Sequence, residues 1–354
     1  MQNKYILSID AGTTSSRAII FNKNAEIVEI AQYEFNQIFP NEGWVEHDAV
    51  EIWNTQLKAI KDVINKSNID PKNIESIGIT NQRETTVIWN KKTGKPVFNA
   101  IVWQDRRTAS FCDELKKNNK AELIQNKTGL VIDAYFSGTK IKWVLDNNPK
   151  IRSQANDGEL LFGTIDTWLI WNLTNGNYHI TDPSNASRTL LYNIKDDKWD
   201  DELLSLFDIP KTILPTVVDS SGISAYVDEN IFGFKIPISG IAGDQQAALF
   251  GQLCTNQGDI KNTYGTGCFC MMNTGKTFVK SNNKMLSTIA WRINGEVSYA
   301  LEGSIFVAGA LIQWLRDKLG IINDASEVEN LANTVDNNGG LTFIPALSGL
   351  AAPY

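Results

Sequence analysis

The hydrophobic positions in the early part of the chain follow a strand period, then a helix period, then a strand period again. Short apolar runs bounded by turn residues predict strands over residues 4–10, 17–21, 27–35 and 74–82. Before the last of these strands, apolar positions repeat every three to four residues and predict a helix over residues 48–67. Asp48 is its expected N-cap, with Glu51 at the spacing of a capping box. The expected apolar stripe of this helix is Val50, Trp53, Leu57, Ile60 and Ile64.

A second cycle of strand and helix patterns appears later in the chain. Residues 237–253 and 298–320 each have the pattern of strand, turn and helix, and residues 259–275 that of two strands joined by a Gly/Thr turn. This order favours a mixed sheet with helices on its faces, and so the α/β class. Because both cycles contain a strand–turn–strand unit with Thr and Gly at its tip, we expect two related domains, residues 1–250 and 251–354, that face one ligand.

The composition excludes several classes of protein. Hydrophobic residues make up 42% and charged residues 21% of the 354 residues, as in an ordinary globular protein of two-domain size. The net charge of -7 disfavours a nucleic-acid-binding surface, which needs a basic face. No apolar run approaches the ~18 residues of a membrane span, and the N-terminus lacks the build of a signal peptide. The few cysteines, with no disulfide pattern, indicate a reduced, cytoplasmic protein.

The stretch "DAGTTSS", residues 10–16, places a carboxylate, a glycine and four hydroxyls at the tip of the first expected hairpin. Backbone N–H groups and hydroxyls that converge on one concavity form an anion nest, and phosphate is its usual occupant. Asp10 would hold an Mg²⁺ that bridges phosphate oxygens, and Arg17 would add charge-assisted hydrogen bonds to a phosphate. The alternative is a plain polar turn, because turns favour Asp, Gly, Ser and Thr in any case.

A similar turn, "NTYGTGC" over residues 262–268, lies in the second cycle. Each turn by itself is about as compatible with a structural role as with ligand binding. Two such turns in matching places of two domains favour a clamp on a polyphosphate. The sequence has no GxxxxGK[ST] pattern, so this clamp would differ from a Walker loop.

Three further stretches carry candidate binding and catalytic groups. Arg83 and Glu84 join a donor and an acceptor, which suits a hydroxyl-rich ligand, and the alternative is a surface ion pair. Consecutive strand residues point to opposite faces, so both can serve one ligand only where the strand ends. Trp103 is either the wall of a pocket or part of the core. Asp244 is either a general base at a helix N-terminus or the N-cap of that helix.

Taken together and in this order, these motifs resemble those of the glycerol kinases, within the sugar- and polyol-kinase family that has the actin/hexokinase-like fold. The matching stretches run from residue 5 to residue 354 and include "DAGTTSSRAIIF", "GITNQRETTVIW", "VWQDRRT", "TDPSNASRTLL", "GIAGDQQAALFGQ", "NTYGTGCF" and "EGSIFVAGALIQWLRD". The resemblance implies two ribonuclease-H-like domains with mixed sheets flanked by helices. It also implies phosphorylation of glycerol to sn-glycerol 3-phosphate, with ATP and Mg²⁺ as cofactors.

The resemblance further implies roles for individual residues. Glycerol would be bound by Arg83, Glu84, Tyr135, Asp244 and Gln245, with Trp103 and Phe269 against its carbon atoms. Asp244 would be the catalytic base, and Asp10 would lie near Mg²⁺. The nucleotide would be bound by Thr13, Thr14, Ser15 and Arg17 from the first domain and by Gly265, Thr266, Gly309 and Gln313 from the second. Tyr135, Phe269 and Gln313 follow from the resemblance alone.

Two features depart from the family pattern. Family members continue past residue 354 with their adenine-binding residues, so we expect a truncated chain with an incomplete second domain and weak activity. In residues 228–239, Asn230 stands where some members carry a phosphorylatable histidine, and residues 233–235 stand where others carry a turn for fructose 1,6-bisphosphate. This loop therefore supports neither form of control. A dimer or tetramer is left open.

Two other functions are alternatives to a glycerol kinase. A kinase for another small polyol or sugar would use the same clamp, although "NQRETT" and "GDQQ" favour glycerol. An actin- or chaperone-like ATPase would use the clamp to drive a conformational change. The ATPase alternative predicts no small-molecule pocket at Arg83, Glu84 and Asp244.

Overall fold

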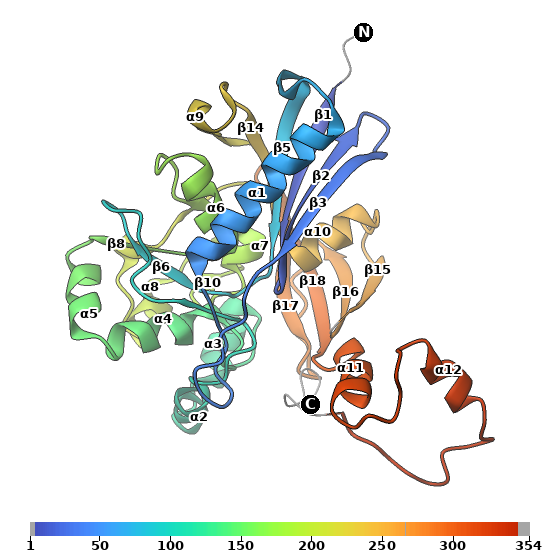
Figure 1. Cartoon of the computed structure of the whole chain (residues 1–354). Coiled ribbons are helices and arrows are strands. Elements are labelled where there is room, and N and C mark those ends of the chain that lie inside the picture. Colours follow the sequence, from blue (N-terminus) through green and yellow to red (C-terminus); the bar gives the residue numbers. More distant parts are fainter. Residues whose placement is uncertain (1–3, 266, 346–354) are drawn as a thin grey trace.

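A mixed sheet of ten strands runs through the computed structural model, which describes residues 4–265 and 267–345 (Figure 1). From one edge to the other its strands are β15 (Ile260–Tyr264), β16 (Cys268–Gly275), β18 (Glu296–Ile305), β17 (Leu286–Ile293), β13 (Ser221–Tyr226), β14 (Pro237–Gly243), β5 (Ile74–Asn81), β1 (Tyr5–Ala11), β2 (Ser15–Asn22) and β3 (Ile27–Glu34). The α/β class with a mixed sheet, expected from the sequence pattern, is confirmed.

The central strands of the sheet explain where a site can form. β1, β2 and β3 make an antiparallel meander, and Asp10 pairs with Arg17 across the first hairpin. β5 is parallel to β1, and β14 is parallel to β5. Asn81 is in register with Ala11 on one side and with Gly243 on the other. Because parallel strands end at the same edge of a sheet, the residues that follow these three positions are brought together.

The first helix, α1 (Ala49–Ser67), confirms the predicted helix and its N-cap. Asp48 accepts a hydrogen bond of 2.8 Å from the backbone N–H of Val50. The capping box does not close as predicted, because Glu51 accepts instead from the side chain of Asn36 at 2.9 Å. The predicted stripe is also wrong in part. Val50 is exposed, whereas Ile52 and Val63 are buried, so the buried face is rotated from the predicted one.

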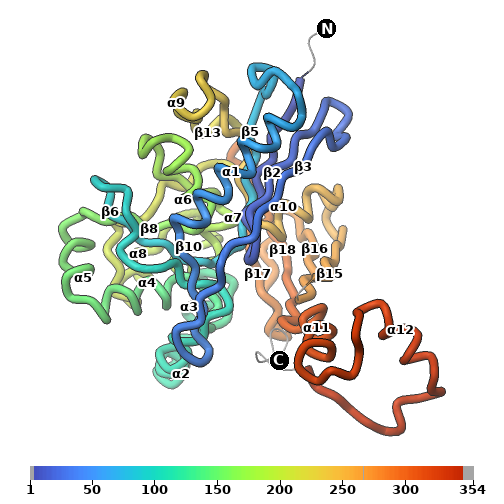
Figure 2. The backbone as a smooth tube through the Cα atoms, viewed as in Figure 1, coloured from blue at the N-terminus to red at the C-terminus, as the bar shows by residue number. Residues whose placement is uncertain are grey.

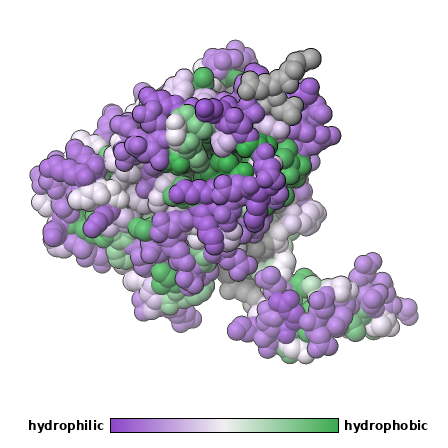
Figure 3. All heavy atoms as spheres, turned by 45° about the horizontal axis from the view of Figure 1, so that its top comes forward, coloured by the Kyte–Doolittle hydropathy of each residue, from purple (hydrophilic) through white to green (hydrophobic). Residues whose placement is uncertain are grey.

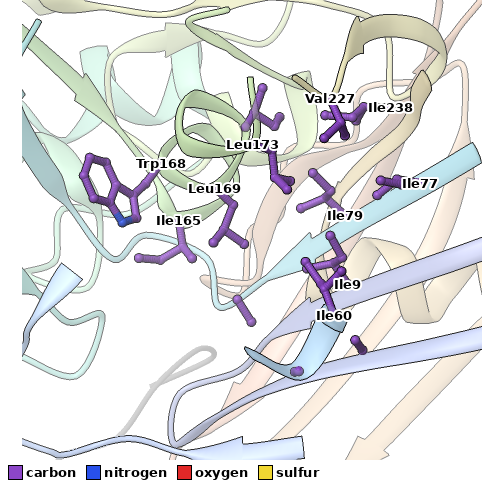
Figure 4. Close-up of a cluster of buried hydrophobic side chains, with 14 of the residues drawn as sticks. Ile9, Ile60, Ile77, Ile79, Ile165, Trp168, Leu169, Leu173, Val227 and Ile238 are labelled. Carbon is purple, nitrogen blue, oxygen red and sulfur yellow. The ribbon is translucent and has the colours of Figure 1, made fainter. Parts of the chain in front are cut away.

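The main core lies between the central strands and two helices, α1 and α6 (Ile165–Leu173). α1 packs on β2 and β3, and α6 packs on β5 and β14. Figure 4 shows part of this cluster, in which Ile60 of α1 and Leu169 of α6 lie on the same side of the sheet as Ile9 and Ile79. Burial of these aliphatic side chains fixes the strands whose ends carry the candidate groups.

The middle of the chain builds a second body of helices beside the sheet (Figure 1). Its helices are α2 (Ala109–Lys117), α3 (Ala121–Thr128), α4 (Ser137–Asp146), α5 (Pro149–Asn156) and α8 (Asp201–Phe207), with a 3-10 turn at Lys211–Ile213. Short strand pairs join them: β4 (Glu46–His47) with β7 (Ala100–Ile101), β6 (Val87–Asn90) with β8 (Leu160–Gly163), β9 (Ile180–Thr181) with β12 (Thr216–Val217), and β10 (Tyr192–Asn193) with β11 (Lys198–Trp199). A separate cluster of buried residues forms its core. Two short helices lie against the sheet instead: α7 (Pro183–Ala186) packs on β14 and β17, and α9 (Glu229–Phe232) packs on the main core. A 3-10 turn at Pro71–Asn73 leads from α1 into β5.

The last part of the described chain forms a second group of antiparallel strands. β15, β16 and β18 are antiparallel neighbours, as β1, β2 and β3 are. The helix α10 (Asp244–Gly251) packs against β5 and β14 from the first part and against β15, β16 and β17 from the second. Residues on α10 are therefore within reach of both parts of the sheet. The helices α11 (Gly309–Asp317) and α12 (Glu327–Ala332) follow β18 and extend away from the main body (Figures 1 and 2).

The face of the molecule drawn in Figure 3 is mostly hydrophilic, with smaller hydrophobic patches between the polar side chains. Within residues 4–265 and 267–345, no helix combines the length and hydrophobicity needed to cross a bilayer.

Candidate active site

The ends of β5 and β14, together with the turns after β1 and β15, enclose a cavity of about 160 Å³. Its walls are Thr13, Gln82, Arg83, Glu84, Trp103, Tyr135, Asp244, Gln245, Thr263, Gly265, Gly267 and Phe269. All of these except Gln82, Thr263 and Gly267 were candidate site residues from the sequence. The structure therefore gathers every residue proposed for the hydroxyl-rich ligand into one cavity.

Arg83 and Glu84 can face the same cavity because β5 has ended at Asn81. Glu84 has a backbone φ of 62°, in the left-handed region that a residue with a side chain seldom adopts. Such strain is found where the surrounding structure holds a functional group in place. Both side chains are at most 2% exposed. The alternative of a surface ion pair is therefore wrong.

Asp244 is the first residue of α10, and Gly243 occupies the N-cap position. The Asp244 carboxylate makes no N-capping hydrogen bond. It accepts a hydrogen bond from the backbone N–H of the next residue, Gln245, at 2.7 Å. Its Oδ1 lies 3.3 Å from Nε of Arg83, and 40% of its side chain is exposed. The N-cap alternative is therefore wrong, and the carboxylate is accessible from the cavity.

A buried network of charges, which the sequence analysis did not identify, supports Arg83 and Glu84. Glu302 of β18 binds Arg83 through its Oε2 at 2.6 Å and Arg188 through its Oε1 at 2.9 Å. Arg188 in turn donates to Oε1 of Glu84 at 2.6 Å. All four side chains are at most 2% exposed. The only signal in the sequence was a charged residue inside an otherwise apolar strand pattern, "YALEGS", and this pattern alone does not name its partner.

Burial and charge within this network shift the pKa values of its two carboxylates, Glu302 and Glu84. Burial alone would raise the pKa of Glu302, but the charges of Arg188 and Arg83 outweigh burial and lower it to about 2. Burial raises the pKa of Glu84, against the opposing charges of the same two arginines. Glu302 is thus the firmly ionised partner of both arginines.

Aromatic side chains form the apolar wall of the cavity. The ring of Trp103 lies 5.7 Å from that of Tyr135 and 6.4 Å from that of Phe269, in edge-to-face geometry. The indole N–H of Trp103 donates to Oγ1 of Thr13 at 2.9 Å. Trp103 therefore joins the wall of the cavity to the first Thr/Gly turn, and it also packs against the core of the helical body.

Apart from Thr266, which lies outside the described residues, the other residues proposed for the nucleotide do not line this cavity. Arg17 donates from Nε to Gln32 at 2.9 Å and lies 3.8 Å from Asp10. Gly309, at the start of α11, contacts the second turn. Its backbone N–H donates a hydrogen bond to the carbonyl of Gly265 at 2.9 Å. The remaining members of the set are Thr14, which is exposed, Ser15, which is half-buried, Gln313, which is exposed on α11, and Thr266, which lies outside the described residues.

Asp10 lies beside the cavity, at the end of β1. Burial raises the pKa of Asp10, the charge of Arg17 opposes this, and the nearby carboxylate of Asp244 raises it further. A bound cation would relieve the repulsion between the carboxylates of Asp10 and Asp244. In the described part of the chain, no group of three or more His, Cys, Asp or Glu residues could hold a metal ion by itself. Mg²⁺ commonly uses one or two carboxylates together with substrate phosphates, so Asp10 fits that kind of site.

Comparison with known proteins identifies the family. Residues 5–251 match the FGGY family of carbohydrate kinases, N-terminal domain, and residues 260–354 match the C-terminal domain of the same family. The chain belongs to the FGGY family of carbohydrate kinases. Its FGGY relatives include glycerol kinase 2 of Thermotoga maritima, with 60% identity over 99% of this chain and 71% of the relative. The glycerol kinase of Alkaliphilus oremlandii is also 60% identical, over 99% of this chain and 70% of its own length.

Solved structures support the FGGY fold. The Plasmodium falciparum glycerol kinase with ADP superposes with a TM-score of 0.90 at 39% identity, over 99% of this chain and 71% of that one. A xylulose kinase from Lactobacillus acidophilus superposes with a TM-score of 0.86 at 23% identity, which shows the same fold. The cavity at Arg83, Glu84 and Asp244 in this FGGY chain contradicts the ATPase alternative, which predicted no small-molecule pocket there.

We predict that Gly243→Ala disables this site of the FGGY chain. A Cβ atom at Gly243 would lie 2.7 Å from both Cγ and Cδ of Arg83, so Arg83 would have to move. We expect at least a tenfold weaker binding of a polyol ligand and a loss of about 1–3 kcal/mol of stability from overpacking. Calorimetric titration and thermal unfolding would measure both.

The matched control is Gly251→Ala at the other end of α10. A Cβ atom there meets nothing within 4 Å, so we expect unchanged binding and equal or higher stability. Unchanged binding in Gly243→Ala would contradict the need for close approach at this glycine.

Proposed function

We propose that this protein transfers the γ-phosphoryl group of ATP to a terminal hydroxyl of glycerol. The observation that carries the proposal is the convergence of Arg83, Glu84 and Asp244 on one cavity, which supplies donors, acceptors and a candidate base together. Relatives named glycerol kinase with 60% identity support the choice of substrate. In this proposal residues 1–250 supply the polyol contacts and the first phosphate turn, and residues 251–354 supply the second turn.

The size of the cavity favours a small polyol. Its volume of about 160 Å³ corresponds to roughly five water molecules at ~30 Å³ each. A space of this size suits a molecule of about six heavy atoms. We therefore infer that the nucleotide lies outside the cavity, along the two Thr/Gly turns.

The polar and apolar walls suit different parts of glycerol. Arg83 and Gln245 carry N–H donors for hydroxyl oxygens, and Glu84 accepts from a hydroxyl. Tyr135 lies beside Arg83, with its hydroxyl oxygen 3.4 Å from Nη2, and burial raises its pKa, so it remains a neutral hydroxyl. The rings of Trp103 and Phe269 would pack against the carbon atoms. An analogue that lacks one hydroxyl would leave buried polar groups unpaired and would be rejected.

The chemistry assigned to Asp244 is general base catalysis. Its carboxylate would accept the proton of the terminal hydroxyl while that oxygen forms a bond to the γ-phosphorus. The bond from the γ-phosphorus to the bridging oxygen breaks, and ADP leaves with the electron pair. Arg83, 3.3 Å from Asp244, would hold the carboxylate in place.

The phosphates would be held by the two turns. Thr13, Thr14, Ser15 and Arg17 in the first turn, and Gly265, Thr266, Gly309 and Gln313 in and beyond the second, are the proposed contacts. Asp10 would hold Mg²⁺, which neutralises phosphate charge when bound. Backbone N–H groups and hydroxyls at such turns stabilise negative charge that develops during transfer.

We predict that ADP release by the purified protein with MgATP depends on glycerol. A coupled assay would measure the rate of ADP release with and without glycerol, and titration calorimetry would measure glycerol binding directly. Xylulose or another sugar at equal concentration is the control substrate. ADP release that is equal with and without glycerol, together with no glycerol binding, would contradict the proposed function.

A further inference from the structure

Lys261 is a buried cation next to the cavity. It lies on β15 and is 5% exposed. Its Nζ donates hydrogen bonds to Oε1 of Gln245 and, at 2.8 Å, to Oγ1 of Thr263. Both acceptors are neutral, and within residues 4–265 and 267–345 no carboxylate oxygen lies within ion-pair distance of its Nζ. A buried ammonium without an adjacent counter-ion is costly, so its position needs a reason.

The hydrogen bond to Gln245 fixes which way the side-chain amide points. An ammonium group only donates, so the oxygen of the amide must face Lys261. The amide nitrogen of Gln245 then points to the opposite side, where it lies 3.4 Å from Oδ2 of Asp244. An amide without such a partner can turn over and exchange its donor and acceptor ends.

The backbone of Gln245 contacts the same Asp244 carboxylate as its side chain. Its N–H donates to Oδ1 of Asp244 at 2.7 Å, so Gln245 contacts both oxygens of that carboxylate. Gln245 and Thr263 both line the cavity, whereas Lys261 does not. The hydrogen bonds of Lys261 therefore reach a ligand through these two side chains.

We propose that Lys261 is a positioning residue for the transfer site, which locks the Gln245 amide with its nitrogen towards Asp244 and the cavity. In this arrangement Gln245 presents a donor to a substrate hydroxyl and to the candidate base. The inference rests on the glycerol kinase activity proposed above, and it adds a residue that the site assignment did not contain.

The charges around Lys261 make the lock sensitive to pH. Burial and, to a smaller extent, the charge of Arg83 lower the pKa of Lys261, and the charges of Glu302, Asp244 and Cys270 oppose this, so that the pKa is about 8. Lys261 is therefore mostly protonated at pH 7 and loses its proton above about pH 8. A neutral amine can accept as well as donate, so the orientation of the amide is no longer enforced.

The test is a double-mutant cycle on the full chain, measured as glycerol affinity by calorimetry at pH 7. We expect Lys261→Met and Gln245→Ala each to weaken glycerol binding about tenfold, the upper end of the usual effect of losing one hydrogen bond between neutral groups. The double variant should bind no more weakly than Gln245→Ala alone, because the proposed effect of Lys261 on glycerol passes through the Gln245 amide. Lys276→Met removes a lysine whose side chain is 72% exposed and should leave glycerol binding unchanged.

A pH series supplies a readout that a merely structural lysine would not change. Glycerol affinity of the natural sequence should fall between pH 7 and 9.5, and that of Lys261→Met should stay level. The inference would be overturned if Lys261→Met bound glycerol as tightly as the unmutated chain. It would also be overturned if the loss of binding free energy in the double variant equalled the sum of the losses in the two single variants. If the unmutated chain binds no glycerol at all, the proposed function is overturned, and this inference with it.

Discussion

Asp244→Asn lowers the rate of glycerol phosphorylation by a factor on the order of 10²–10⁴ and leaves glycerol affinity nearly unchanged. The amide of asparagine still accepts one hydrogen bond from the N–H of Gln245, at the position where the carboxylate now accepts at 2.7 Å. It cannot take the proton of the attacking hydroxyl. The loss therefore falls on turnover, which a coupled ADP-release assay measures, and not on binding, which calorimetry measures.

The matched control is Asp48→Asn. Asp48 is also an aspartate at a helix N-terminus, but it caps α1 through the backbone N–H of Val50. Asparagine is an equally good N-cap, so neither turnover nor stability should change. If Asp244→Asn retains the turnover of the unmutated chain, Asp244 is not the base.

Glu302→Gln destabilises the protein by about 3–5 kcal/mol, the usual cost of removing one partner from a buried ion pair. The substitution keeps the size of the side chain but removes the charge that Arg83 and Arg188 share at 2.6 and 2.9 Å. Such a loss is a large part of the ~5–15 kcal/mol that stabilises a typical domain. Arg83 also loses the group that orients it, so we expect glycerol affinity to fall at least tenfold. Denaturant unfolding and calorimetry would measure the two effects.

The control for Glu302→Gln is Glu296→Gln on the same strand. Glu296 pairs with Lys276 at 2.8 Å, but both side chains are more than two-thirds exposed, so the pair is screened by water. Stability and glycerol affinity should both stay close to those of the unmutated chain. Equal stability of the two variants would contradict the role assigned to the buried network.

The pH dependence of stability offers an independent check on Glu302. Its folded-state pKa of about 2 lies below the ordinary value of 4.5, so it stabilises the fold above pH 4.5. This contribution is lost as the pH falls from about 4.5 towards 2. The stability difference between the unmutated chain and Glu302→Gln should therefore shrink over that range.

Local patterns in the sequence determined the elements and the polar turns. The strand periods predicted β1, β2, β3 and β5, and Asp48 predicted the start of α1. Each of these features depends on residues that are only a few positions apart, so it can be recognised from the sequence alone. The stretch that contains Arg83 and Glu84 was also recognisable, because both follow the end of a strand. Tyr135 and Phe269 had no such local signal and were found through resemblance to a family.

Only the tertiary structure decided how the site is held together. Glu302 reaches Arg83 across 219 positions of sequence and Arg188 across 114, and Lys261 meets Gln245 through the packing of α10 on β15. A single sequence shows no pattern for contacts of this kind, because the pairing is set by the order of strands in the sheet. The buried face of α1 and the position of Asp244 within α10, rather than before it, also depended on packing. The sequence by itself therefore determined which groups could take part in the chemistry, and the long-range packing determined which of them share a cavity and which buried charges hold them there.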